Sequence, residues 1–238
     1  MSTAGPADVV TRVAKDRDEL VAQASRAELE GSPRVDLSLR TLDVVLAGSA
    51  LVALSPVMAA IAVATRLTSG RPVLYRGERV GRYGVVFTMY KFRTLAPDAE
   101  TRLGPYLGPE LTRLTESELT PLGRVLRAMY LDELPQLINV VRGDMSLVGP
   151  RPVRPAFFDA LREEIPQYWQ RLVVRPGLTG FAQVRVDREH SWAEKLNHDL
   201  EYIADRSVGL YGAVILGTGV RVIGRVASSL TGRGAKGP

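Results

Sequence analysis

The chain has 238 residues, of which 45% are hydrophobic, enough to build one catalytic domain with a modest appendage. It contains no cysteine, which excludes a disulfide scaffold and any zinc or iron–sulfur site with cysteine ligands. Its two histidines, His190 and His198, are too few for a multi-histidine metal site. The formal net charge of +5 indicates an anionic partner, either nucleic acid, acidic lipid or a phosphorylated substrate.

Residues 1–33 differ from the rest of the chain in charge. They hold four basic and six acidic residues, a net −2, so the remainder carries +7. The segment closes with Gly31-Ser32-Pro33 and lacks the basic start and apolar middle of a signal peptide. We predict a flexible N-terminal tail over residues 1–33, with no chemical role.

Val44–Ala64 is a run of 21 residues without a charged side chain, a length typical of a membrane-spanning helix. Ser55-Pro56 lies at its centre, where proline removes a backbone hydrogen bond and clashes with the preceding turn, so a break or a kink is expected. Each half, at about 1.5 Å per residue, reaches roughly halfway through a hydrocarbon core. The residues alone favour a kinked span, but they leave a re-entrant helix open.

Seven basic residues and one acid lie between Arg66 and Arg93, directly after this apolar run. Positive charge in such a place marks the cytoplasmic side and attracts anionic headgroups. Residues 73–75 and 85–92 are predicted strands around a turn at residues 81–84. Residues 97–119 are predicted to form only short helical pieces, followed by a short helix over Thr120–Arg127.

The pair Asp132 and Glu133 carries the strongest signal for chemistry. Pro135 follows them, and proline is tolerated only in the first turn of a helix, so both acids are expected at a helix N-terminus. An N-cap with a first-turn acid is the ordinary interpretation of such a pair. Carboxylates at a helix start among guanidinium groups also suit a phosphate-handling site with a divalent cation. The neighbouring arginines are Arg127, Arg142, Arg151 and Arg154.

Apolar residues recur at helical spacing over 157–172, interrupted by Pro166, a pattern typical of a core stripe. Residues 175–184 have a loop-then-strand pattern. A capping box predicts a helix from Ser191, on which Asp199 lies within an apolar face. A carboxylate in that place is costly unless it is paired or functional. The apolar tail over Val208–Leu230, interrupted by two arginines, suits an interfacial segment better than a span.

Leu131–Pro152 reads L-D-E-L-P-Q-L-x-N-V-x-x-G-D-M-S-L-V-G-P-R-P and so resembles the signature of the bacterial sugar transferase family. These are the monotopic phosphoglycosyl transferases that load polyprenyl phosphate carriers. Lys91-Phe92-Arg93-Thr94 is similar to the family's K-F-R-T element, and Arg175–Val184 to its R-P-G-x-T-G-x-A-Q-V. The Ser55-Pro56 pair also matches. The resemblance covers roughly residues 34–224.

The resemblance implies an α+β, predominantly helical fold with a small β-hairpin. A re-entrant membrane helix over 34–66, turned back at Ser55-Pro56, would precede a single catalytic domain over 67–230 with interfacial helices. With this resemblance we predict the re-entrant topology rather than the span. The implied location is the cytoplasmic face of the bacterial inner membrane, with anionic membrane lipid as a partner.

The implied reaction is transfer of a sugar-1-phosphate from a UDP-sugar to a membrane polyprenyl (undecaprenyl) phosphate, with release of UMP. It would be the first membrane step of a cell-surface glycan pathway. Asp132 would be the nucleophile and a Mg²⁺ ligand, and Glu133 would assist by proton transfer or positioning. The implied substrate or phosphate contacts are Lys91, Arg93, Arg127, Arg151, Arg175 and Asp199. A homo-oligomer is left open.

Two other functions fit part of the sequence. A basic membrane-associated module that only binds lipid has no use for Asp132, Glu133 and Asp199. A nucleic-acid binder would be expected to show zinc-finger spacing or an aromatic-basic RNP motif, and neither is present, so no nucleic-acid partner is predicted. The chain departs from the family at Arg185-Val186-Asp187, where Asn-Gly-Arg is usual. Because of this departure, the resemblance does not predict which residues form the nucleotide and sugar pockets.

Overall fold

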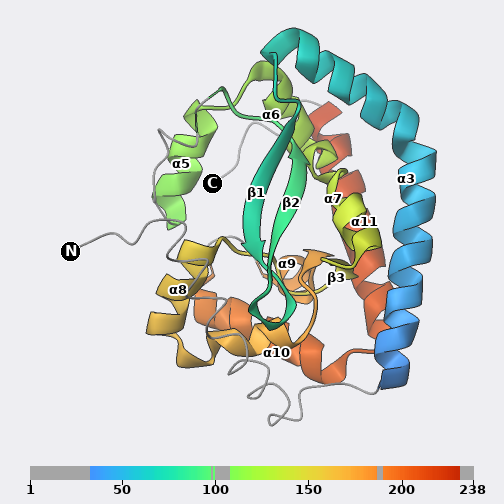
Figure 1. Cartoon of the computed structure of the whole chain (residues 1–238), viewed down its shortest axis with the longest axis vertical. Helices are drawn as coiled ribbons and strands as arrows, with labels where there is room; N and C mark the ends of the chain where they lie inside the picture. Colours follow the sequence, from blue (N-terminus) through green and yellow to red (C-terminus); the bar gives the residue numbers. More distant parts are fainter. Residues whose placement is uncertain (1–32, 98, 100–107, 187–189, 231–238) are drawn as a thin grey trace. The chain divides into compact units, whose positions relative to one another are not determined.

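The computed structural model describes residues 33–97, 99, 108–186 and 190–230 (Figure 1). The predicted tail therefore lies outside the described residues except for Pro33, and so does Asp187. The described chain is predominantly helical with two small sheets, which confirms the predicted helical character and the small β-hairpin. It forms two compact units. Unit 1 comprises residues 33–51, 77–89 and 136–218, and unit 2 comprises 52–76, 90–135 and 219–230. The single catalytic domain stays a prediction.

Helix α3 (Pro33–Ser69) is assigned as one helix with Pro56 inside it, so the chain stays helical through the predicted break. Proline leaves the carbonyl oxygen of Val52 without its usual helical donor. The Ser55 hydroxyl donates to that oxygen at 2.8 Å and replaces the lost bond. The boundary between the units falls after Leu51, close to this pair. The re-entrant topology stays a prediction.

Within the described part of the chain, two helices are long and apolar enough to cross a membrane, judged by length and composition: α3, and the Val208–Arg225 part of α11 (Val208–Leu230). Only 11% of the most apolar window of each helix is buried. On α3 the exposed side chains include Leu37, Val52 and Leu67, which are 69%, 76% and 80% exposed. Apolar side chains in such numbers on a helix surface call for a non-aqueous environment.

Strands β1 (Leu74–Val80) and β2 (Val86–Phe92) form the predicted hairpin around a short turn, η1 (Arg82–Gly84) (Figure 1). Residues 77–89 of the hairpin belong to unit 1, and the outer strand ends belong to unit 2. Unit 2 contains in addition the helices α5 (Gly108–Ser117) and α6 (Pro121–Ala128) and the single turn η2 (Leu131–Glu133). Helix α6 confirms the short helix expected from residue 120.

Unit 1 is built mostly from the second half of the chain. Its elements are α7 (Gln136–Arg142), β3 (Ser146–Val148), α8 (Pro155–Glu164), η3 (Pro166–Val173), β4 (Gly177–Thr179), α9 (Phe181–Arg185), α10 (Trp192–Asp205) and the first half of α11. The predicted capping box at Ser191 begins α10. Of the stripe over 157–172, Phe158, Leu161 and Leu172 lie in the core and are at most 6% exposed, whereas its other members are partly buried: Phe157, Ile165 and Trp169.

The strand predicted at the end of residues 175–184 is wrong, because residues 181–185 form α9 and the strand β4 precedes them. Strand β4 pairs in parallel with β3, matching Ser146 to Gly177. The pairing needs glycine on both sides. A Cβ on Gly177 would lie 2.1 Å from the backbone nitrogen of Gly149, and one on Gly149 would lie 2.4 Å from the carbonyl oxygen of Arg175.

Candidate active site

The turn that carries Asp132 and Glu133 is anchored by its two flanking leucines. Leu131 and Leu134 pack against a small core of unit 2 formed by Ile61, Phe92 and Leu126. The Leu-Asp-Glu-Leu pattern therefore points its apolar ends into the core and holds the two acids between them. The acids precede α7 in a single 3₁₀ turn, close to the predicted position at a helix start.

Asp132 is only 6% exposed, which is unusual for a carboxylate. Burial raises the pKa of Asp132, and the neighbouring Glu133 charge raises it further, whereas Lys91 and Arg127 lower it. Burial also strips water from the carboxylate, and a poorly hydrated carboxylate is a better nucleophile. The two cations oppose this rise in the pKa and favour the charged form of the carboxylate.

Glu133 is held by Lys91 of β2. The Lys91 Nζ lies 2.5 Å from the Glu133 Oε1, and the two side chains are 19% and 18% exposed. The structure thus brings together two predicted site residues that lie 42 positions apart in the sequence. Because Lys91 also lowers the pKa of Asp132, one ammonium group serves both carboxylates.

Arg127 is oriented by Thr94, a contact that the sequence analysis missed. The Arg127 Nε donates to the Thr94 Oγ1 at 3.0 Å. Helix α6 lies directly on this threonine, since a Cβ on Gly123 would come within 2.0 Å of the Thr94 carbonyl oxygen. The same oxygen accepts from the Thr120 N–H at 3.0 Å. The threonine of the K-F-R-T element is the only sequence signal for this role.

Arg93 is buried and binds the end of α3. Its Nη1 donates to the carbonyl oxygen of Arg71 at 3.0 Å, and its Nη2 donates to the carbonyl oxygen of Ser69. Free carbonyl groups at a helix C-terminus are natural partners for a guanidinium. These bonds occupy two of its N–H groups, and phosphate contact by Arg93 stays a prediction.

The carboxylates of unit 2 suit one mode of metal binding. Among the described residues, no group of three or more His, Cys, Asp or Glu side chains is placed to hold a metal by itself. Mg²⁺, however, is commonly bound through one or two carboxylates together with substrate phosphates. Asp132 fits that mode, because it is a nearly buried carboxylate with the cations Lys91 and Arg127 near it.

In unit 1, Asp199 is paired with Arg171, which the sequence analysis did not name. The Asp199 Oδ2 accepts from the Arg171 Nη2 at 2.7 Å and from its Nε at 3.1 Å, and both side chains are nearly fully buried. Burial raises the pKa of Asp199, and the guanidinium opposes that shift. Arg171 also donates to the Tyr168 hydroxyl at 2.6 Å, and burial raises the pKa of Tyr168 to about 12, so this hydroxyl stays protonated.

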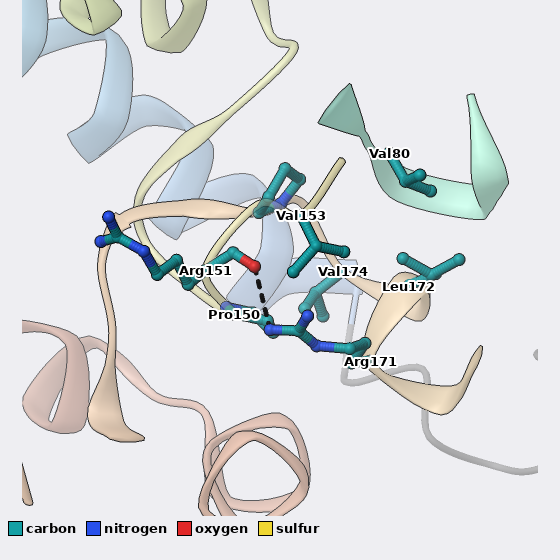
Figure 2. Close-up of a pocket in the computed structure, with 8 residues that line it drawn as sticks. Val80, Pro150, Arg151, Val153, Arg171, Leu172 and Val174 are labelled. Atoms are coloured by element: carbon teal, nitrogen blue, oxygen red, sulfur yellow. Dashed lines mark hydrogen bonds between the residues drawn. The ribbon is translucent and has the colours of Figure 1, made fainter. Parts of the chain in front are cut away.

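The same guanidinium holds the loop after β3. The Arg171 Nη2 donates to the carbonyl oxygen of Arg151 at 3.0 Å (Figure 2). Both arginines line a small, mostly apolar pocket, together with Val80, Pro150 and Val153 among others. Figure 2 shows the Arg151 guanidinium pointing away from the pocket. The Arg171–Asp199 pair therefore fixes the backbone of a predicted phosphate contact.

Two arginines bind the carbonyl groups at the end of α7. Arg40 donates to the carbonyl oxygens of Val140 and Val141 at 2.6 and 2.9 Å, and the Arg175 Nε donates to that of Gly143 at 2.9 Å. Burial, together with the charges of Arg82 and Arg40, lowers the pKa of Arg175. Phosphate contact by Arg175 stays a prediction, as does that by Arg151.

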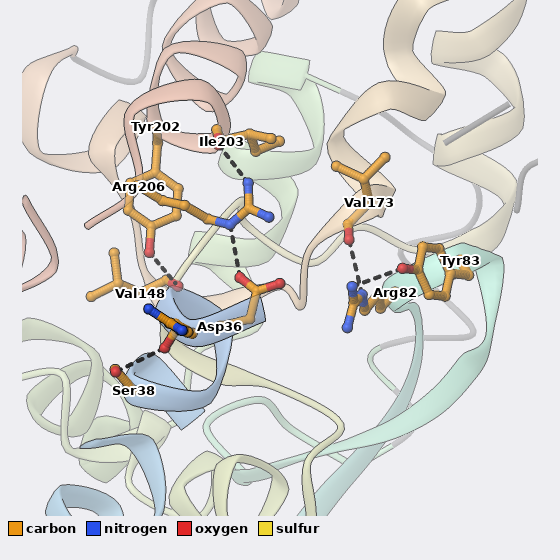
Figure 3. A network of polar contacts seen from close by, with 10 residues as sticks. Asp36, Ser38, Arg82, Tyr83, Val148, Val173, Tyr202, Ile203 and Arg206 are labelled. Atoms are coloured by element: carbon orange, nitrogen blue, oxygen red, sulfur yellow. Dashed lines mark hydrogen bonds and ion pairs between the residues drawn. The ribbon is translucent and has the colours of Figure 1, made fainter. Parts of the chain in front are cut away.

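Further polar contacts tie the elements of unit 1 together (Figure 3). Arg206, at the end of α10, donates to Asp36 in the first turn of α3 at 3.0 Å. Tyr202 donates to the carbonyl oxygen of Val148 at 3.3 Å, which joins α10 to β3. Arg82 donates to the carbonyl oxygen of Val173 at 2.9 Å. Of these contacts, the Tyr202 bond holds the Asp199 helix against the strand that precedes the Arg151 loop.

Comparison with known proteins decides the family. The bacterial sugar transferase family matches residues 35–225. The chain belongs to this family. A UDP-N-acetylgalactosamine-undecaprenyl-phosphate N-acetylgalactosaminephosphotransferase of Aeromonas hydrophila is 37% identical over 212 residues, which cover 86% of this chain and 46% of that protein.

Other relatives give similar identities. A UDP-glucose:undecaprenyl-phosphate glucose-1-phosphate transferase of Caulobacter vibrioides is 40% identical, over 71% of this chain and 63% of that protein. The exopolysaccharide production protein PSS of Rhizobium leguminosarum bv. phaseoli is 36% identical, over 80% of this chain and 98% of that protein. The chain thus spans about half to two thirds of the first two relatives and nearly all of the third.

Proposed function

We propose that this chain transfers a sugar-1-phosphate from a UDP-sugar to a membrane polyprenyl phosphate, with release of UMP, in the synthesis of an exopolysaccharide or a related surface glycan. The observation that carries the proposal is the nearly buried Asp132 carboxylate, with the Lys91–Glu133 ion pair and Arg127 close enough to affect its charge. The names of the undecaprenyl-phosphate transferases among its relatives support the substrate classes.

The reaction proceeds in two displacements at one phosphorus atom. The Asp132 carboxylate attacks the β-phosphorus of the UDP-sugar, the phosphoanhydride bond breaks, and UMP leaves, which puts the phosphosugar on the aspartate. An oxygen of the polyprenyl phosphate then attacks the same phosphorus and frees the carboxylate. One anhydride is broken and one is made, so the exchange is near balance.

The other side chains of unit 2 stabilise charge during both displacements. Arg127 and Lys91 supply positive charge near the transferred phosphate. Glu133 either accepts a proton from the carrier phosphate or helps to position that phosphate through its ion pair with Lys91. Asp132 would hold Mg²⁺, which, when bound, neutralises diphosphate charge.

The pH dependence of UMP release should reveal the charges around Asp132, which must be ionised to attack. Lys91 lowers the pKa of Asp132, so Lys91→Gln is expected to raise it and to move the acid limb of the rate profile to higher pH. Glu133 raises that pKa, so Glu133→Gln is expected to move the limb to lower pH. Steady-state rates across a pH series test this. Shifts of both variants in one direction would contradict the assignment.

For the membrane, we propose that α3 is re-entrant and that the catalytic part lies on the cytoplasmic face. Tags at residues 5 and 236 are then both inaccessible from outside the cell. Pro56→Ala restores a helical donor at the centre of α3 and is expected to move the N-terminal tag to the outside. Val63→Ala, an apolar change away from the proline, serves as the control. External labelling of the N-terminal tag in the unaltered protein would contradict the re-entrant topology.

Carrier-dependent release of UMP tests the function itself. The purified chain in nanodiscs is supplied with Mg²⁺, undecaprenyl phosphate and each of several UDP-sugars in turn. We expect UMP and a polyprenyl diphosphosugar to form in equal amounts with at least one donor. Binding of anionic vesicles without any UMP release would favour a lipid-binding module instead.

A further inference from the structure

Tyr130 has a backbone conformation that tyrosine rarely adopts. Its φ and ψ angles are 57° and 16°, in the left-handed helical region, and among the described non-glycine residues only Tyr83 also has a positive φ. A residue with a Cβ is disfavoured there because the Cβ comes too close to a carbonyl oxygen. Such a conformation persists where the surroundings impose it, and it is found preferentially at functional sites.

Tyr130 forms the connection between α6 and the turn that carries the two carboxylates. Its N–H donates to the carbonyl oxygen of Arg127 at 3.3 Å, and its own carbonyl oxygen accepts from the N–H of Glu133 at 3.3 Å. Asp132 lies within the turn closed by this second bond. A change in the Tyr130 backbone would therefore move the Asp132 carboxylate.

Arg225 of α11 binds the Tyr130 side chain. The guanidinium carbon lies 5.1 Å from the centroid of the tyrosine ring, within the range of a cation–π contact. The Arg225 Nη1 also donates to the Tyr130 hydroxyl at 2.5 Å. Tyr130 keeps 37% of its surface exposed, so burial in a core does not by itself fix the ring. The contact with Arg225 of α11 therefore helps to fix the position of the Tyr130 ring.

We propose that Arg225 and Tyr130 are positioning residues of the transfer reaction. Arg225, stacked on the ring, holds residue 130 in the left-handed conformation and thereby holds Asp132 where it can attack the donor phosphate. Neither side chain touches the reacting atoms, because both act through the backbone of the turn. This role rests on the proposed function of Asp132.

The test measures adduct formation in a single turnover, with the full chain and UDP-sugar mixed without carrier. Arg225→Gln is expected to slow formation of the aspartyl adduct by about tenfold, with the half-saturating UDP-sugar concentration changed by less than about twofold. Tyr130→Phe keeps the ring but loses the hydroxyl, so a smaller loss is expected. Arg221→Gln removes the same charge from the same helix and is expected to match the unaltered protein.

Tyr130→Gly separates positioning from direct contact with substrate. Glycine adopts the left-handed conformation without the Cβ penalty, and it removes the ring on which Arg225 acts. In this background Arg225→Gln is expected to change the rate by less than about twofold, because the ring through which Arg225 acts is already absent. A tenfold loss that persists there, or an unaltered rate for Arg225→Gln alone, would overturn the proposal. Absence of the adduct in the unaltered protein would instead contradict the aspartyl intermediate and the positioning role with it.

Discussion

Asp132→Asn is expected to abolish UMP release from the UDP-sugar. The amide is nearly the same size as the carboxylate and occupies the same buried site, but it is not a nucleophile toward phosphorus. We expect the rate to fall at least about a thousandfold, equivalent to roughly 4 kcal/mol at the barrier. A radiolabelled donor with separation of UMP measures this loss.

Glu133→Gln is the matched control for this change. It alters the adjacent acid by the same chemistry, removes the partner of Lys91 and leaves the nucleophile in place. The variant is expected to be slow but to retain partial release of UMP. Equal residual activity in the two variants would contradict the division of roles between the acids.

Asp199→Asn is expected to destabilise the protein as well as to slow it. Loss of the carboxylate charge leaves the buried Arg171 guanidinium without its counter-ion, which costs about 3 to 5 kcal/mol. The midpoint temperature of thermal unfolding should fall by several degrees. The rate of UMP release should also fall, because Arg171 is then less firmly placed to bind the Arg151 carbonyl oxygen. Unfolding midpoints and rates measured on the same preparations test both effects.

A double replacement separates stability from activity at this pair. Arg171→Met with Asp199→Leu substitutes apolar side chains for a buried ion pair, a change that is often neutral for stability. We expect the unfolding midpoint to recover much of its loss, but UMP release to stay low, because no side chain then binds the Arg151 carbonyl oxygen. Recovery of both quantities would make the pair purely structural.

Local signals in the sequence predicted those elements whose ends are set by one or two neighbouring residues. Thr120 and Pro121 begin α6, and the Ser191 capping box begins α10, because both devices satisfy backbone groups within a few residues. The hairpin was likewise predicted from the turn at residues 81–84. In each case the deciding interaction is local, and so it is visible in a short window of sequence.

Features that depend on distant contacts were not predictable in this way. The three-residue strands β3 and β4 show no alternating pattern, and their pairing depends on the close approach of Gly149 and Gly177. The left-handed Tyr130 has no residue signal, since glycine or asparagine would be expected there. The partner of Asp199 also lies 28 positions away.

Within the candidate site, the residue types were predictable, but their contacts were not. The sequence identified Lys91 and Asp132 through motifs, and Arg127 through its position five residues before Asp132. Only the structure shows that Lys91 pairs with Glu133 and that Thr94 orients Arg127. A motif names the chemistry that a position supports, whereas tertiary packing decides which groups face each other.

Intact-protein mass spectrometry after mixing with UDP-sugar alone, without polyprenyl phosphate, tests the central claim most directly. The unaltered chain and Glu133→Gln are predicted to gain the mass of one phosphosugar, and the added mass should disappear when the carrier is supplied. Asp132→Asn is predicted to gain none. An adduct that persists in Asp132→Asn would move the nucleophile elsewhere, and a chain that releases UMP with carrier yet never carries the added mass would contradict the aspartyl intermediate.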